Sequence, residues 1–109
     1  MFYRMKFDGM VGEILNKAGY TTNAQKFEIW PAGLSATLIK QGKGLGFGAQ
    51  TAACMGLAEF ISGTPEIDNN RKILILDAAI RVAGQDDKVE QNVINKLHEL
   101  KSELRAYRE

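Results

Sequence analysis

The chain has 109 residues, of which 45% are hydrophobic and 25% charged, close to the average of soluble globular proteins. Its 14 Lys and Arg residues nearly balance its 13 Asp and Glu residues, and the net charge of +1 excludes a polybasic nucleic-acid arm, an acidic tail and composition-driven disorder. A single cysteine excludes an internal disulfide framework and a cysteine-based zinc finger. The length predicts a single domain over residues 1–109.

Targeting features are not expected in this chain. Charged residues interrupt positions 1–8, so the apolar stretch of a secretion signal is missing there. The most apolar window, residues 51–61, is far shorter than the roughly 20 residues that a membrane span requires. With a single cysteine and no export signal, we expect a cytoplasmic protein that has no membrane partner.

The N-terminal segment predicts a strand followed by a helix. Residues 2–7 alternate between apolar and basic side chains, which is typical of a short half-buried strand. Asp8 then stands at an N-cap position, and apolar residues at helical spacing predict a helix over 9–18. Gly19 is expected to end this helix in a left-handed conformation.

The next segment predicts a β-hairpin. Residues 26–30 and 35–40 are rich in β-branched and aromatic side chains, and they flank the turn-forming sequence Pro31-Ala32-Gly33. The alternative for residues 31–41 is a helix that starts at the proline, with two leucines, Leu34 and Leu38, on its inner face.

Three further helices are predicted, over 49–62, 71–83 and 88–107. The first has a face of small residues that can meet another backbone closely. The second is apolar almost all round, so we expect it to be the central helix and Ile80→Ala to be among the most destabilising truncations. Asp87 and Glu90 have the spacing of a capping box for the third helix.

Together these elements predict an α+β fold. A small antiparallel sheet, made of the strand and the hairpin in the N-terminal half, would be covered by about four helices, and the C-terminal half would be helical. The alternative is an all-α bundle.

A glycine-rich segment before the helix at 49–62 is the candidate ligand site. Converging backbone N–H groups, a helix N-terminus and a lysine favour a phosphate, so a nucleotide or another phosphate-containing small ligand is the expected occupant. The lysine stands too early for a P-loop, and a flexible connector is the alternative. The candidate residues are Gly42, Lys43, Gly44, Gly46 and Gly48.

No catalytic residue, metal site or cofactor is predicted. His98, the only histidine, has no carboxylate at the facing positions of its helix, and Cys54 stands among alanines, where a buried small side chain is expected. Asp86 and Asp87 lack the spacing of an EF-hand loop, and helix capping accounts for them.

Charge is distributed unevenly along the chain. Residues 1–50 hold six basic and three acidic residues, whereas residues 51–109 hold eight and ten. A strand face that mixes lysines and aromatic residues suits a single-stranded nucleic acid, but the positive excess is small. Nucleic-acid binding therefore ranks third among the functional hypotheses.

The C-terminal helix carries the candidate interface. Its apolar residues recur at a period of 3.5, and this seam serves either self-association or docking on the domain's own core. Our main hypothesis is a small non-enzymatic protein-binding module, such as an adaptor, inhibitor or assembly factor, that acts as a homo-oligomer. The candidate interface residues are Leu97, Leu100, Leu104 and Tyr107.

Overall fold

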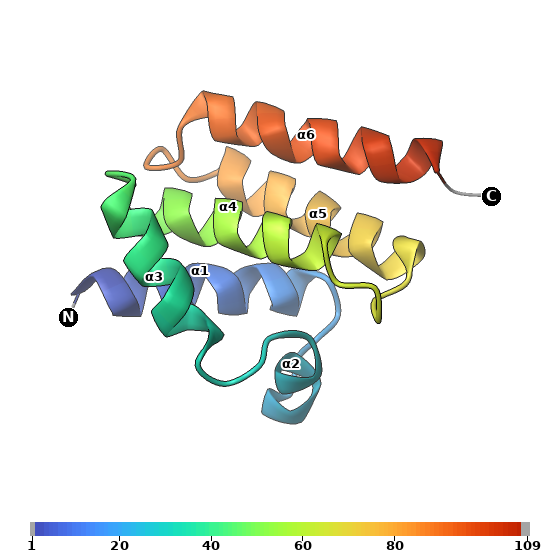
Figure 1. Ribbon diagram of the computed structural model, residues 1–109, viewed down its shortest axis with the longest axis horizontal. Helices are drawn as coiled ribbons and strands as arrows, with labels where there is room; N and C mark the ends of the chain where they lie inside the picture. Colours follow the sequence, from blue (N-terminus) through green and yellow to red (C-terminus); the bar gives the residue numbers. More distant parts are fainter. Residues whose placement is uncertain (1, 108–109) are drawn as a thin grey trace.

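A computed structural model describes residues 2–107, and these residues form six α-helices and no strand (Figure 1). The helices are α1 (Phe2–Lys17), α2 (Asn23–Ile29), α3 (Leu34–Gly44), α4 (Ala49–Ser62), α5 (Asn69–Gly84) and α6 (Gln91–Ala106). α4 lies at the centre and contacts α1, α3, α5 and α6, whereas α2 lies at the edge of the molecule. α3 crosses α1 and α4 steeply, and the other long helices run roughly along the 42 Å axis.

The all-helical architecture shows that the predicted α+β fold is wrong and that the alternative, an all-α bundle, describes the chain. Residues 2–7 form the first turns of α1 rather than a strand. Tyr3 and Phe7 share a face in a strand and also in a helix, because residues four apart align on one side of a helix. Met5 would share that face in a strand, but it is exposed.

α1 is one continuous helix because the apolar residues that it packs against the core, from Tyr3 to Leu15, recur at helical spacing. Asp8 therefore lies inside the helix rather than at its start, and its Oδ2 accepts a hydrogen bond from Arg4 Nε at 2.7 Å. The predicted left-handed end is confirmed, since Gly19 has a φ of +104°. The residues of α1 that face the core are Phe7, Met10, Val11, Ile14 and Leu15.

The predicted hairpin is also wrong, because α2 and α3 occupy its two arms. A capping box starts α2: Thr22 Oγ1 accepts from the Gln25 backbone N–H at 3.1 Å, and Gln25 Oε1 accepts from the Thr22 N–H at 3.0 Å. Gly33 turns the chain with a φ of +88°, and α3 begins at the next residue rather than at Pro31.

The centre of the core is α4, and its predicted bounds are confirmed. Its small residues admit α3 closely: a Cβ added to Gly42 of α3 would lie 2.5 Å from the Cβ of Ala52. α5 is more peripheral than predicted, because Leu74 is exposed and Ile80 is only partly buried. Ile75 and Leu76 are its large, fully buried side chains.

α6 packs on α5 and α4 and begins later than predicted. Glu90 precedes the helix, but its side chain makes no capping hydrogen bond, so the predicted capping box does not form. An ion pair of 2.7 Å between Lys101 Nζ and Asp77 Oδ1 joins α6 to α5. Within residues 2–107, no helix has the length and apolar character needed to cross a membrane.

Candidate functional site

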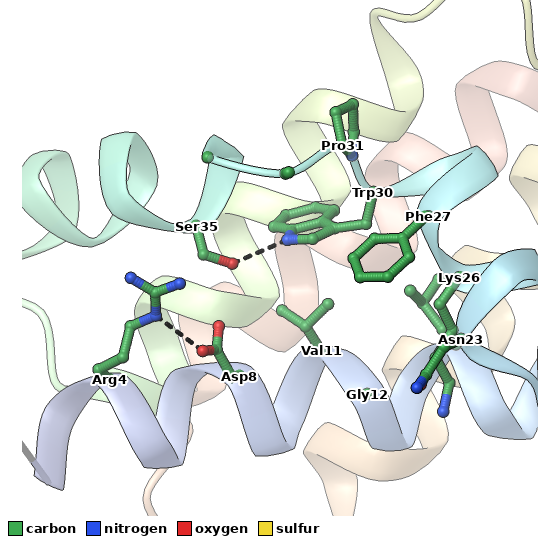
Figure 2. Close-up of a pocket in the computed structure, with 13 residues that line it drawn as sticks. Arg4, Asp8, Val11, Gly12, Asn23, Lys26, Phe27, Trp30, Pro31 and Ser35 are labelled. Carbon is green, nitrogen blue, oxygen red and sulfur yellow. Dashed lines mark hydrogen bonds and ion pairs between the residues drawn. The ribbon is translucent and has the colours of Figure 1, made fainter.

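A cleft of about 370 Å³ lies between α1, α2 and the first turn of α3 (Figure 2). This volume is at the lower end of the roughly 300–1,000 Å³ that is typical of ligand pockets. The apolar walls are formed by Val11, Leu15, Phe27, Trp30 and Pro31. The polar edge is formed by Arg4, Asp8, Asn23, Lys26 and Ser35.

Trp30 forms the back wall, and side chains of two other elements, α3 and α4, hold its ring. The residue is 8% exposed, and its Nε1 donates a hydrogen bond of 2.8 Å to Oγ of Ser35 in the first turn of α3. The ring also meets Phe60 of α4 in a T-shaped contact, with 5.6 Å between centroids and 76° between planes. The wall is therefore fixed before any ligand arrives, which lowers the entropic cost of binding.

Phe27 stands at the mouth of the cleft. It lies in α2, Trp30 is the residue that follows this helix, and the two rings lie on the same side of it (Figure 2). Although it lies on a helix, Phe27 is 64% exposed. Burial of apolar surface is favourable by about 25 cal/mol per Å². A ligand that covers the exposed Phe27 ring would therefore gain binding free energy from this burial.

The charges at the cleft are mainly positive. Arg4 is paired with Asp8, whereas Lys26 makes no ion pair within residues 2–107. The start of α3 borders the cleft, and its N-cap, Gly33, offers no side-chain hydrogen bond. Because α3 also lacks an acidic residue in its first turn, the partial positive charge of its N-terminus is not offset by a side chain of that turn.

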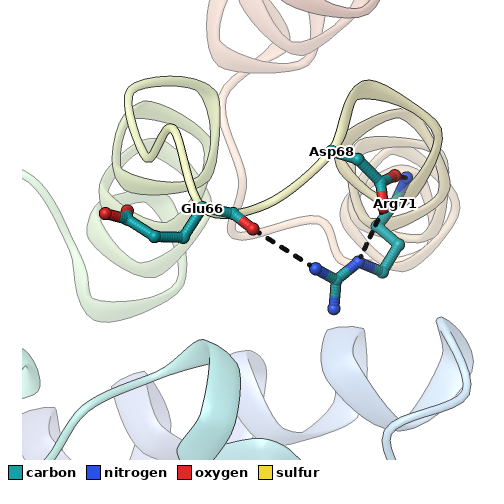
Figure 3. A network of polar contacts seen from close by, with 3 residues as sticks. All are labelled: Glu66, Asp68 and Arg71. Carbon is teal, nitrogen blue, oxygen red and sulfur yellow. Dashed lines mark hydrogen bonds and ion pairs between the residues drawn. The ribbon is translucent and has the colours of Figure 1, made fainter.

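A second, wider groove of about 570 Å³ lies between the end of α2 and the α4–α5 loop. The cation that lines this groove, Arg71, is already paired within the chain. Its Nε pairs with Asp68 Oδ2 at 3.2 Å, and an Nη donates to the Glu66 carbonyl oxygen at 3.4 Å (Figure 3). No large exposed aromatic ring borders this groove within the described residues. The first cleft, between α1, α2 and the start of α3 (the α1–α2 cleft), is therefore the better candidate site.

The glycine-rich segment forms the last turn of α3 and the short connection between α3 and α4. The N–H of Phe47 donates to the carbonyl oxygen of Gly42 at 2.9 Å, and the N–H of Gly46 donates to that of Lys43 at 3.1 Å. This pair of hydrogen bonds is a Schellman motif, and it places Gly46 in the left-handed region with a φ of +80°. The helix end therefore accounts for Gly46, and the close approach of Ala52 accounts for Gly42.

Lys43 lies on the side of Tyr3, with its ammonium group 5.0 Å from the centre of that ring. The hydroxyl of Tyr3 donates to the Phe47 carbonyl oxygen at 2.8 Å. Gly48 follows as the N-cap of α4, without a side-chain cap. The structure thus brings these candidate residues together at the α3–α4 junction, and phosphate binding there stays a prediction.

The candidate interface residues of α6 divide into buried and exposed members. Leu97 is fully buried, and Leu100 and Leu104 pack partly against the core. Tyr107, at the end of the helix, is 79% exposed. Most of the seam therefore packs within the chain, and only its last residue is largely free on the surface.

The remaining chemically notable side chains do not assemble into a reactive centre. Burial, together with the charge of Asp86, raises the pKa of Cys54 to about 12, so its thiol is protonated at neutral pH. His98 is exposed on α6. No cluster of three or more metal-ligating side chains occurs among residues 2–107.

Three aromatic residues of the basic N-terminal half, Tyr3, Trp30 and Phe47, do not form a stacking face. Trp30 is buried, and Tyr3 and Phe47 are partly buried and hydrogen-bonded to each other.

No match to this chain was found among family models, curated proteins or solved structures. The case for a function therefore depends on the cleft itself.

Sequence reasoning missed this cleft because residues 26–30 were interpreted as a strand. In a strand, Phe27 and Trp30 would point to opposite faces, since side chains alternate. The signal that reveals α2 is Thr22 followed three residues later by Gln25, which is the spacing of a capping box.

Proposed function

We propose that the protein is a non-enzymatic binding module that holds a short segment of a partner protein in the α1–α2 cleft. The observation that carries this proposal is the pair of aromatic rings: Trp30 is fixed as the back wall, and Phe27 is exposed at the mouth. Aromatic residues that bury a large area at low entropic cost are typical anchors of protein interfaces.

The size of the cleft supports a segment with one bulky side chain. Its volume of about 370 Å³ is small for an extended groove, and apolar side chains form its floor and back wall. Polar groups at the edge would orient the backbone of the segment. An adaptor, inhibitor or assembly factor would each use such a site.

Self-association and a cytoplasmic location belong to the same proposal. Self-association is supported by Tyr107, which is exposed at the end of α6, and by Leu74, which is exposed on neighbouring α5. The cytoplasm is supported by the single cysteine, because proteins of oxidising compartments are commonly stabilised by disulfides.

The experiment that tests the binding proposal is selection from a displayed library of random linear peptides against the immobilised protein. Enriched peptides should bind the wild type, and their affinity for Phe27→Ala should be lower by about thirty-fold or more. Truncation of a central aromatic residue in an interface costs about 2 kcal/mol or more, which corresponds to that loss.

The matched control is Phe2→Ala, since Phe2 is also an exposed phenylalanine but does not line the cleft. It should bind the enriched peptides as the wild type does. Both variants should unfold within about 0.5 kcal/mol of the wild type, because surface substitutions rarely cost more. Failure to enrich any peptide, or equal binding to Phe27→Ala, would contradict the proposed function.

A further inference from the structure

We infer that the partner segment is acidic, with a bulky apolar side chain between two carboxylates. This inference rests on the proposed function and specifies the chemistry of the occupant. It is based on where the charged side chains lie: the cations stand at the ends of the cleft, and the apolar side chains form the walls between them.

The two cations stand at opposite ends of the cleft. Figure 2 shows Arg4 at one end, on the first turns of α1, and Lys26 at the other end, on α2, with Val11 and the two aromatic rings between them. An extended segment that crosses the cleft therefore passes one cation before the apolar walls and the other after them.

Both cations retain capacity for a ligand. Within the described residues, the only hydrogen bond of the Arg4 guanidinium is that of its Nε to Asp8 Oδ2, at 2.7 Å. Its Nη groups are available to a second carboxylate in the side-on geometry that arginine favours. Lys26 forms no ion pair within residues 2–107.

Acidic groups are scarce around the cleft. Asp8 is the only carboxylate among the residues that line it, and Arg4 already neutralises that charge. The N-terminus of α3 adds partial positive charge at the same edge. A ligand with carboxylates on both sides of its apolar group complements this distribution, whereas a basic ligand is repelled.

The probes are capped five-residue peptides with a central phenylalanine, flanked on both sides by glutamate, by glutamine or by lysine. Trp30 is the only tryptophan in the chain, so its fluorescence reports directly on the cleft wall. We expect the glutamate peptide to bind about ten-fold more tightly than the glutamine peptide in low salt, because each of two exposed charge pairs contributes up to about five-fold. The preference should shrink in about 0.5 M salt, where charges are screened.

A charge reversal provides the decisive comparison. Lys26→Glu should remove the preference for the glutamate peptide and increase the affinity for the lysine peptide. The matched control is Lys6→Glu, since Lys6 is an exposed lysine of α1 outside the cleft and the substitution changes the net charge equally. This control should retain the order of affinities that the wild type shows.

The outcomes separate this inference from the proposed function. Equal binding of the glutamate and glutamine peptides would overturn the acidic segment while leaving the binding module intact. Failure of library selection and of all three peptides would contradict both. Stronger binding of single-stranded oligothymidylate than of the peptides, lost in Lys26→Glu, would also overturn the inference, because the cations would then serve a nucleic acid.

Discussion

The indole Nε1 of Trp30 donates a hydrogen bond of 2.8 Å to Oγ of Ser35, and this contact joins the end of α2 to the first turn of α3. Both residues are buried and lie on either side of the turn at residues 31–33. The hydrogen bond therefore fixes the edge helix α2 against the body of the molecule and shapes the back wall of the cleft.

Removal of the acceptor should destabilise the protein. Ser35→Ala leaves the indole N–H buried without a partner, which costs about 1–3 kcal/mol in the free energy of unfolding. Urea denaturation measures this loss, and Ser102→Ala, at an exposed position of α6, is the control that should be near neutral. A Ser35→Ala variant as stable as the wild type would show that the contact does not stabilise the wall.

Two glycines of α3 should respond in opposite directions to the same substitution. Gly42→Ala places a Cβ 2.5 Å from the Ala52 Cβ and 3.1 Å from the Tyr3 hydroxyl oxygen, so α3 and α4 must separate. Such overpacking costs about 1–3 kcal/mol. Gly44→Ala meets nothing within 4 Å and should stabilise the helix by about 0.5–1 kcal/mol. Thermal or urea unfolding gives both values, and equal effects would contradict the close packing of the two helices.

Parts of the fold follow directly from the sequence. The bounds of α4 agree with the spacing of its small residues and the Gly63-Thr64-Pro65 stop. α5 begins at Asn69, two residues before its predicted start, because Asp68 caps the helix by accepting from the Arg71 N–H at 2.8 Å. Caps and breakers act through neighbouring residues, so a local sequence pattern is sufficient to predict them.

The parts of the fold that were predicted incorrectly depend on tertiary contacts or have short, ambiguous sequence patterns. Aromatic and β-branched residues at 26–40 favour strands by propensity, but packing against α1 and α4 decides their conformation. The cleft unites side chains of α1, α2 and α3, and it exists only once the turn at Gly33 has oriented α2. A local sequence pattern does not determine how α2 is oriented against α1 and α3.

Stability should fall at alkaline pH through Cys54. Burial raises the pKa of its thiol from 9.0 to about 12, so the folded state retains a proton that the unfolded state has lost between these values. The free energy of unfolding is therefore unaffected below about pH 8 and should fall by about 1 kcal/mol at pH 10 through this group.

The comparison that isolates this effect is Cys54→Ala, measured by urea unfolding at pH 7 and pH 10. Lysines and tyrosines titrate equally in both proteins, so their contribution cancels. The wild type should lose about 1 kcal/mol more than the variant between the two values of pH. An identical loss in both proteins would mean that the thiol is not protected by the core.

Self-association is tested at Tyr107, the exposed end of the α6 seam. We expect sedimentation velocity to show a dimer of the wild type at micromolar concentration and a monomer of Tyr107→Glu, because a charge in a small apolar contact is costly. Leu45→Glu, at an exposed position after α3, is the control and should remain dimeric. A monomeric wild type over this range would exclude self-association through α6.

Two-dimensional NMR of the ¹⁵N-labelled protein shows directly whether the α1–α2 cleft holds the ligand. The peptide with phenylalanine between glutamates is the titrant. We expect the shift changes to concentrate at cleft residues, led by the Trp30 indole N–H and the backbone of Phe27 and Lys26. Changes concentrated at Gly42–Gly48, or at the end of α6 around Tyr107, would contradict this expectation and place the binding surface elsewhere.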